Sequence, residues 1–314
     1  MKKGIWFAIG AYLAWGIFPI YWKWLHTVPA LQIIAHRIIW SFVLLATIIF
    51  FTRQWKAFRA AAIHRRVLLI YLASGILLTI NWLTYVWAVN AGFVVETSLG
   101  YFINPLLSVL LGVIFLHEHL RPWQVVPLGL ATVGLAYVAF SYGVFPWIAL
   151  TLAFSFGFYG LVKKTAPLGS LYGLTLETGW VFLPALGFLF YMERLGQGAF
   201  LHTSLTQDLL MAGAGVVTTV PLLMFASAAQ RIPLSMVGVL QYIAPTLQFL
   251  LGVFLYREPF NRDLLIGFCI VWTALILFWG EGMWTNRKLR RKIPLAPDKP
   301  NLVAVPEPVK EEGD

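Results

Sequence analysis

Charged residues are scarce in this sequence: Asp, Glu, Lys and Arg make up 11% of its 314 residues, whereas hydrophobic residues make up 60%. A soluble domain carries about 25% charged residues, because its surface must be hydrated. The scarcity of charge therefore excludes a soluble globular protein and predicts an all-α polytopic membrane protein. Fourteen tryptophans and twelve tyrosines support this prediction, since amphipathic rings favour the headgroup layer of a bilayer.

Cysteine is nearly absent, and the common motifs of enzymes are missing. The one cysteine, Cys269, lies inside the last apolar run, which excludes a disulfide framework. The sequence contains no G-x-x-x-x-G-K-[ST] loop for nucleotide phosphates, no H-E-x-x-H helix and no G-x-S-x-G elbow. We therefore expect no catalytic residue, no metal site and no cofactor.

Acidic residues are few, so that the net charge is +10. A basic protein can bind nucleic acid, but the lysines and arginines here stand almost entirely between apolar runs and in the C-terminal segment. The preference of membrane proteins for positive charge on the cytoplasmic side explains this distribution more simply. We expect a lipid bilayer and no nucleic acid as partner.

Ten apolar runs are long enough to be helices that cross a bilayer, which takes about 20 mostly apolar residues. If the N-terminus is cytoplasmic, the cytoplasmic segments hold eighteen Lys and Arg residues and the outer segments hold four. This bias places both termini in the cytoplasm. The segment 286–314 is basic at first, then rich in proline and acid, and is predicted to be a disordered tail. The predicted spans are 4–22, 30–51, 67–88, 93–116, 123–140, 146–162, 171–191, 209–230, 234–256 and 263–282.

One phrase occurs twice in the chain. Residues 103–118 read INPLLSVLLGVIFLHE and residues 243–258 read IAPTLQFLLGVFLYRE, with eight of sixteen positions identical. An offset of 140 or 141 aligns further parts of the segments 4–140 and 146–282, which we interpret as two repeats of five helices each. A unit with an odd number of spans ends on the opposite side of the membrane, so the second repeat is predicted to be inverted.

Inverted repeats are a recurrent plan of secondary transporters, because two oppositely oriented halves can open alternately to either side. A duplication retained only for packing is the alternative. Proline-interrupted helices at matching places in both repeats favour transport.

Six stretches, in this order along the chain, form a recognisable set. They are HRIIWSF (36–42), NWLTYVWAVN (81–90), ETSLGYFINPLLSVLLG (96–112), LAFSFGFYGLVKK (152–164), VVTTVPLL (216–223) and QYIAPTLQFLLGV (241–253). Together they resemble the EamA branch of the drug/metabolite transporter superfamily, and within it the RarD-type permeases. The resemblance extends from about residue 4 to about residue 282. It implies a ten-helix permease of a bacterial inner membrane with two five-helix halves, and it implies no particular substrate.

Polar residues gather around the prolines of the repeated phrase. A proline leaves the carbonyl four residues earlier without its helical partner, which in a membrane is tolerated against protein or a watery cavity. Simple kinks and hydrogen bonds between helices are the alternatives. Tryptophans are assigned mainly to packing and to the interface, with stacking on an apolar substrate as a second role. The candidates for the cavity lining are Asn81, Ser98, Tyr101, Asn104, Pro105, Thr218, Thr219, Gln241, Tyr242 and Pro245.

Charged residues inside spans are candidates for coupling or gating, because a charge is costly there without a partner or a cavity. Arg37 and Glu96 lie near the same predicted face and form the expected ion pair. The neighbouring His36 is a candidate proton carrier, since histidine titrates near neutral pH. Structural pairing that locks helices together is the alternative.

Glu177 occupies the position of Arg37 in the second repeat, near the opposite face. We expect it to pair with Lys163 or Lys164 at the end of the sixth span. Glu118 and Glu258 end the fourth and ninth spans, where they would cap helices or pair with Arg121 and Arg257.

The sequence thus predicts a permease that moves a small organic metabolite or drug by alternating access, through a central cavity between the repeats. Because a nucleotide-binding loop is missing, coupling to protons or to exchange of solutes is expected. A membrane-embedded enzyme, a channel and a non-transporting scaffold are the alternatives, but isolated carboxylates within the spans do not favour an enzyme.

Overall fold

The computed structural model describes residues 1–91, 93–141, 145–257, 262, 265–267, 269–278 and 280, and every regular element in this part of the chain is a helix. Helical residues are also found between Leu265 and Phe278. The predicted tail, 286–314, lies outside the described residues. The elements are α1 (Lys2–Trp24), α2 (Ala30–Phe51), α3 (Trp55–Ala62), α4 (Arg65–Asn90), α5 (Val94–Leu116), α6 (Pro122–Ser141), α7 (Trp147–Thr165), α8 (Ser170–Arg194), α9 (Leu205–Ala229), α10 (Leu234–Gln241), α11 (Ile243–Leu250) and the π-helix η1 (Leu251–Leu255).

The helices agree closely with the predicted spans, although fewer of them are long and apolar enough by composition to cross a membrane. Within the described residues seven segments have this character: α1, α2, α4, α5, α8, α9 and the run from α10 to η1. The last turn of α7 carries Lys163 and Lys164, which lowers its apolar content. The short α3 occupies a segment predicted to be a cytoplasmic loop.

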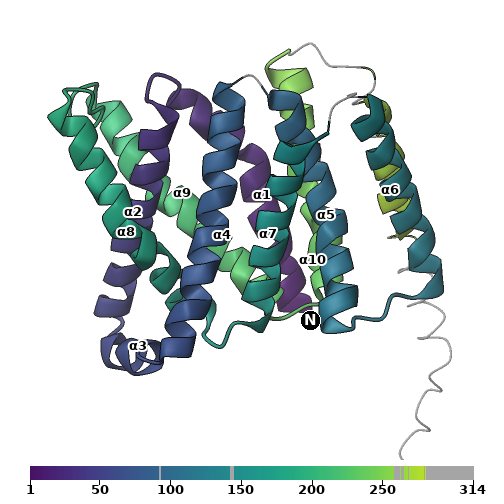
Figure 1. Ribbon diagram of the computed structural model, residues 1–314, viewed down its shortest axis with the longest axis horizontal. Coiled ribbons are helices and arrows are strands. Elements are labelled where there is room, and N and C mark those ends of the chain that lie inside the picture. The colour runs from purple at the N-terminus through teal and green to yellow at the C-terminus, as the bar shows by residue number, and fades with distance from the viewer. Residues whose placement is uncertain are drawn as a thin grey trace, which may run out of the picture.

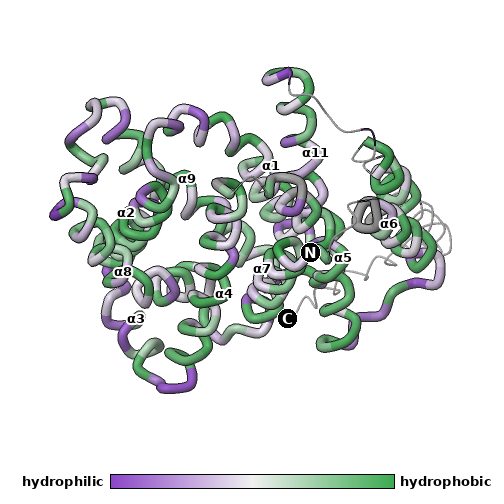
Figure 2. Tube along the Cα trace, turned by 45° about the horizontal axis from the view of Figure 1, so that its top comes forward, coloured by the Kyte–Doolittle hydropathy of each residue, from purple (hydrophilic) through white to green (hydrophobic). Residues whose placement is uncertain are grey.

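Apolar residues surround most of these helices on all sides, as expected for helices that face lipid as well as protein. Large apolar side chains such as Phe51, Leu183 and Ile276 are more than two-thirds exposed. Such side chains would be costly in water but are well solvated by hydrocarbon. Green, hydrophobic stretches accordingly run along most of the helices in Figure 2.

Helices α2 and α8 pack against each other in opposite directions. Ile38 lies in a cluster with Ala185, whereas Ile49 lies in a cluster with Leu176. Between these clusters the rings of Phe42 and Phe182 have centroids 4.8 Å apart. Since residue numbers rise along one helix as they fall along the other, the two helices are antiparallel.

Helices α5 and α10 are antiparallel in the same way. The carboxylate of Glu118 accepts hydrogen bonds at the start of α10. At the other end of the contact, the hydroxyl of Tyr242 donates to the carbonyl oxygen of Phe102 at 3.4 Å. A Cβ atom on Gly238, between these points, would lie 2.6 Å from the carbonyl oxygen of Pro105.

Contacts between the segments 4–140 and 146–282 occur in matching sets. Helix α1 packs against α9 and α11, and α7 packs against α4 and α5. Gly16 of α1 faces Leu247, and Gly157 of α7 faces Leu107. Gly16 corresponds to Gly157 at an offset of 141, and Leu107 corresponds to Leu247 at an offset of 140. Figure 1 shows α2, α8 and α9 on one side of the molecule and α6 at the other, beside α5.

The two copies of the repeated phrase differ in their helices. Helix α10 ends at Gln241 and α11 begins at Ile243, so the backbone is interrupted just before Pro245. Helix α5 instead continues without a break through Pro105. The prediction that both helices are interrupted is therefore wrong for the first copy of the phrase. A proline bends a helix but need not end it, because neighbouring groups can form a hydrogen bond with the carbonyl that the proline leaves unpaired.

The close approach of α9 to α2 generates a prediction about stability. A Cβ atom added at Gly215 would lie 2.5 Å from Cβ of Trp40 and 2.6 Å from its carbonyl carbon. We expect Gly215→Ala to lower the free energy of unfolding by about 1–3 kcal/mol, the usual cost of overpacking. Thermal unfolding of the purified protein in detergent would show a midpoint lower by several degrees. In the matched control Gly187→Ala the new methyl group meets no atom within 4 Å, and equal midpoints for both variants would contradict the prediction.

Candidate substrate cavity

A cavity of about 360 Å³ lies among helices of both segments. Its walls come from the second half of α1, α4 and α9, the first half of α2, α5 and α7, and the segment that includes the end of α10 and α11. Most of the wall is aromatic or apolar, with a few amides and one guanidinium group. The lining residues are Tyr12, Trp15, Phe18, Pro19, Trp22, Arg37, Asn81, Trp82, Tyr85, Gly100, Tyr101, Asn104, Leu152, Phe156, Leu222, Gln241, Ala244, Pro245 and Gln248.

Helix α1 contributes one aromatic face to the cavity. Tyr12, Trp15, Pro19 and Trp22 recur every three or four residues, which places them on one side of the helix. The spacing is visible in the sequence, but an aromatic face of this kind has the same pattern when it packs in a core. The sequence prediction therefore assigned these tryptophans mainly to packing, whereas Trp15 and Trp22 line the cavity.

Arg37 is the one charged residue among those that line the cavity. Its Nε donates a hydrogen bond of 2.9 Å to Oγ1 of Thr218 on α9. Its Cζ lies 4.7 Å from the ring centroid of Trp22 and 4.4 Å from that of Trp82, within the range of cation–π interactions. The side chain therefore links α2 to α1, α4 and α9 at the edge of the cavity.

Amide side chains form the polar part of the wall. Nδ2 of Asn81 donates to the carbonyl oxygen of Leu152 at 2.9 Å and to Oγ of Ser155 at 3.1 Å, which joins α4 to α7. Oδ1 of Asn104 and Oε1 of Gln241 are buried and have no hydrogen-bond partner in the described part of the chain. An unpaired buried acceptor is costly, so both oxygens would gain a partner if a rearrangement of the wall brought a donor to them.

The carbonyl that Pro19 frees from its helix has found a partner. Nε2 of Gln248 on α11 donates to the carbonyl oxygen of Trp15 at 3.0 Å. The sequence predicted the freed carbonyl, but not the glutamine, because Gln248 lies 233 positions along the chain from Trp15.

The other predicted lining residues lie around the cavity rather than in its wall. Thr218 binds Arg37, and Thr219 is buried with an unpaired hydroxyl. Tyr242 packs with Phe102 on the far side of α10. Pro105 faces α6 in a separate small gap. Ser98 belongs to α5, but its side chain lies outside the described residues. Of the ten predicted residues, the structure brings five together in the wall: Asn81, Tyr101, Asn104, Gln241 and Pro245.

The predicted ion pair between Arg37 and Glu96 is wrong. Arg37 binds Thr218 and two indole rings instead, and Oε2 of the buried Glu96 has no hydrogen-bond partner among the described residues. Both residues lie near the same end of their helices, but similar depth does not determine which way a side chain points. His36, next to Arg37, is buried against Phe200 with ring centroids 5.0 Å apart and faces away from the cavity.

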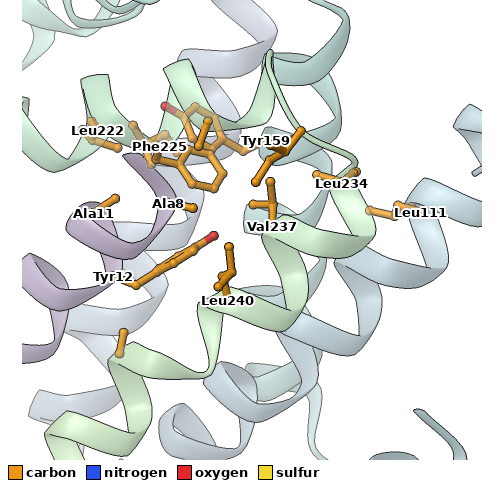
Figure 3. Close-up of a cluster of buried hydrophobic side chains, with 14 of the residues drawn as sticks. Ala8, Ala11, Tyr12, Leu111, Tyr159, Leu222, Phe225, Leu234, Val237 and Leu240 are labelled. Carbon is orange, nitrogen blue, oxygen red and sulfur yellow. The ribbon is translucent and has the colours of Figure 1, made fainter. Parts of the chain in front are cut away.

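The molecule is closely packed on one side of the cavity, toward the beginning of α1 and the end of α7. Tyr12 and Phe225 have ring centroids 6.3 Å apart, and Phe225 stacks on Tyr159 at 5.8 Å. Figure 3 shows these rings together with Leu234, Val237 and Leu240 of the same cluster. This cluster, the closing layer, separates the cavity from that end of the molecule.

A buried ion pair lies beyond the closing layer. Nζ of Lys163 is 2.5 Å from Oε1 of Glu177, and both side chains are at most 2% exposed. The hydroxyl of Ser74 donates to Oε1 at 2.7 Å, and that of Tyr159 donates to Oε2 at 3.4 Å. Lys163 is one of the two lysines that the sequence predicted as partners for Glu177. The pair joins α7 to α8, and Ser74 adds α4.

Two more polar contacts join helices at this end. The carboxylate of Glu118 accepts hydrogen bonds from the backbone N–H groups of Leu234 and Ser235, at 2.5 and 2.8 Å, and from the hydroxyl of Ser235. Carboxylates are favourable at the N-terminus of a helix, where N–H groups have no helical partner. Lys164 does not pair with Glu177; its Nζ donates to the carbonyl oxygen of Ile232 at 2.7 Å. Glu258 lies outside the described residues.

The described residues contain no group of three or more His, Cys, Asp or Glu side chains that could hold a metal ion. The polar groups of the wall are amides, phenols and one guanidinium, which suit an organic solute better than a metal.

The buried ion pair generates a prediction about stability. Lys163→Met would leave the Glu177 carboxylate buried without a cation, and we expect a loss of about 3–5 kcal/mol in the free energy of unfolding. The double variant Lys163→Met, Glu177→Leu removes both charges and should recover most of that loss. Thermal unfolding in detergent measures both. The exposed pair between His202 and Glu193 provides the control, since His202→Gln should change stability by less than about 1 kcal/mol. A single variant as stable as the double variant would contradict the prediction.

Comparisons with known proteins give the family. The model of the EamA-like transporter family matches residues 2–140 and again residues 146–280. The chain is 50% identical over 281 residues to the uncharacterized transporter YojE of Bacillus subtilis, which covers 88% of this chain and 93% of that protein. Protein RarD of Streptomyces exfoliatus is 40% identical over 97% of this chain and 96% of its own length. Protein RarD of Escherichia coli K12 is 40% identical over 91% and 97%.

A solved crystal structure supports the fold alone. It is 17% identical in sequence, with a TM-score of 0.63 over 88% of this chain and 97% of that chain. The matches of the family model cover most of the chain, and the relatives match nearly their full length. This protein is therefore a multi-pass membrane protein of all-α fold that belongs to the EamA-like transporter family.

Proposed function

We propose that this protein is a secondary transporter of a bacterial inner membrane that moves a small organic solute by alternating access. The observation that carries the proposal is the cavity of about 360 Å³ enclosed by helices of both segments. Cavities of this size with mainly aromatic walls and a few polar groups are typical of sites for small organic molecules.

We propose further that residues 4–140 and 146–282 form two inverted repeats, with both termini cytoplasmic. The antiparallel packing of α2 on α8 and of α5 on α10 supports this, because these are the equivalent helices of the two repeats. Repeat-equivalent residues also touch each other, as expected along a two-fold axis. The rings of Trp15 and Phe156 are 5.8 Å apart, and those of Phe42 and Phe182 are 4.8 Å apart.

The two ends of the molecule then correspond to an open and a closed gate. Glu177 is the repeat counterpart of Arg37, and Lys163 is the counterpart of Trp22. At one end Glu177 meets Lys163 and a hydroxyl of α4; at the other end Arg37 meets Trp22 and a hydroxyl of α9. The cluster around Glu177 lies beyond the closing layer, whereas the cluster around Arg37 borders the cavity. Alternating access would exchange these roles.

The charged residues near the cavity supply candidates for coupling. Opening the packed end would separate Lys163 from Glu177, and protonation of Glu177 would weaken their attraction. Glu96 is a second buried carboxylate with an unpaired oxygen. We propose Glu177 as the principal coupling candidate, because it lies where the helices must part.

Transport can be tested by counterflow in proteoliposomes, with a panel of labelled amino acids, nucleosides and aromatic carboxylates. We expect exchange of at least one solute class, and Ala244→Phe should slow it at least about tenfold, because the added ring enters the wall of the cavity. The matched control Ala73→Phe adds the same ring to an exposed position of α4 and should leave the rate unchanged. Exchange that is equal in both variants, or absent for every solute, would contradict the proposal.

Orientation can be tested by labelling single cysteines with a membrane-impermeant maleimide in a Cys269→Ser background. Ala60 of α3 and His202 before α9 are both exposed and lie at opposite ends of the molecule. With cytoplasmic termini, we expect His202→Cys to react in intact cells and Ala60→Cys to react only after lysis. The reverse order of labelling would show that the proposed orientation is wrong.

A further inference from the structure

We propose that the solute is an organic monocarboxylate, bound through the terminal nitrogens of Arg37. This inference rests on the proposed transport function and names the class of solute for the same cavity. Its starting point is an unbalanced charge: Arg37 is the only charged residue in the wall formed by the described residues. A cation in a membrane is costly unless an anion or water offsets it.

The hydrogen bonds of Arg37 leave one side of the guanidinium group free. Nε is taken by Thr218 at 2.9 Å. The terminal nitrogens Nη1 and Nη2 donate to no side chain or carbonyl of the described residues, and they are not among the fully buried unsatisfied atoms. They are therefore accessible from the cavity. Together they present the planar fork that binds both oxygens of a carboxylate at once.

The surroundings of Arg37 fix this fork in place. Trp22 and Trp82 lie within 5 Å of its Cζ and restrict rotation of the group, while the bond to Thr218 sets its plane. Both aromatic rings attract the cation but cannot accept its in-plane N–H groups as a carboxylate can. A charged donor that is held before the ligand arrives loses little entropy on binding.

No protein carboxylate competes for Arg37 in the described part of the chain. Glu177 is held by Lys163. Glu118 is held by the start of α10. Glu96 is buried but makes no ion pair with Arg37. The anion that balances Arg37 is therefore expected to come from the solute.

The rest of the cavity indicates the body of the solute. Beyond Arg37 the wall offers the rings of Trp15, Phe18 and Phe156, which suit an aromatic or apolar group. One cation balances one negative charge, so a polyanion such as a nucleotide would leave charges unpaired against apolar walls. Asn104 and Gln241 add polar residues to the same wall.

The test uses three probes with one body: 3-phenylpropionate, 3-phenylpropionamide and 3-phenylpropylamine. Binding to the purified full-length protein in detergent is measured by calorimetry. We expect the carboxylate to bind about 10- to 100-fold more tightly than the amide, as for a hydrogen-bonded charge pair, and the amine to bind most weakly. Equal affinity for the three probes, or preference for the amine, would overturn the inference.

Variants of Arg37 locate the effect. In Arg37→Gln the preference for the carboxylate should disappear, and in Arg37→Lys, which keeps the charge without the fork, it should fall but persist. The matched control Arg194→Gln removes an arginine that stacks on exposed Phe190 outside the cavity, and should keep the full preference. If Arg37→Gln fails to fold, the three-probe series still tests the preference for the carboxylate, and the Arg37→Lys variant still tests whether the guanidinium fork causes it. A preference that Arg37→Lys leaves undiminished would overturn the role of the fork.

The failure of this inference and the failure of the transport proposal have different signatures. Exchange of neutral or cationic solutes in proteoliposomes, with no preference for carboxylates, would overturn the inference and leave transport supported. Carboxylate binding that depends on Arg37, without exchange of any solute, would support the inference and contradict transport.

Discussion

Polar groups inside a membrane must find their partners within the protein, and in this molecule they find them across the boundary between the two repeat segments. Arg37 of the first segment binds Thr218 of the second, and Glu177 of the second binds Ser74 of the first. The charge of Glu177 is balanced within its own segment by Lys163, whereas Arg37 makes no ion pair with a described residue and contacts Thr218 and two indole rings instead. The bonds of Arg37 to Thr218 and of Ser74 to Glu177 join helices of both segments on either side of the cavity.

Much of the fold could be predicted from hydropathy and from the repeat, because both are local properties of the chain. Most of the helix bounds and the partnership of Glu177 with Lys163 were predicted from such patterns. The pairing of Arg37 with Glu96 failed because depth in the membrane does not fix the direction of a side chain. The aromatic wall of α1 was assigned mainly to packing and to the interface, with stacking on a substrate as a second role, since its spacing is the same in a packed core and around a cavity. The partnership of Gln248 with Trp15 depends on contacts 233 positions apart in the chain.

The two copies of the repeated phrase show how one pattern can give two local structures. Helix α5 continues through Pro105, while the chain of the second copy is interrupted at Tyr242. In α5 the proline faces α6, whereas Pro245 faces the cavity with Gln241 and Ala244. The interruption thus occurs in the copy whose proline borders open space, where freed backbone groups can be hydrated.

The bond between Glu118 and the start of α10 determines which parts of the molecule can separate. Glu118 lies two residues after the end of α5 and accepts hydrogen bonds from three donors at the beginning of α10. These two helices are therefore joined, although one belongs to the segment 4–140 and the other to the segment 146–282. Any rearrangement that keeps these hydrogen bonds must move the connected ends of α5 and α10 together. The moving bodies would then contain helices from both segments, 4–140 and 146–282, so the boundary between the segments need not be the boundary between the moving bodies.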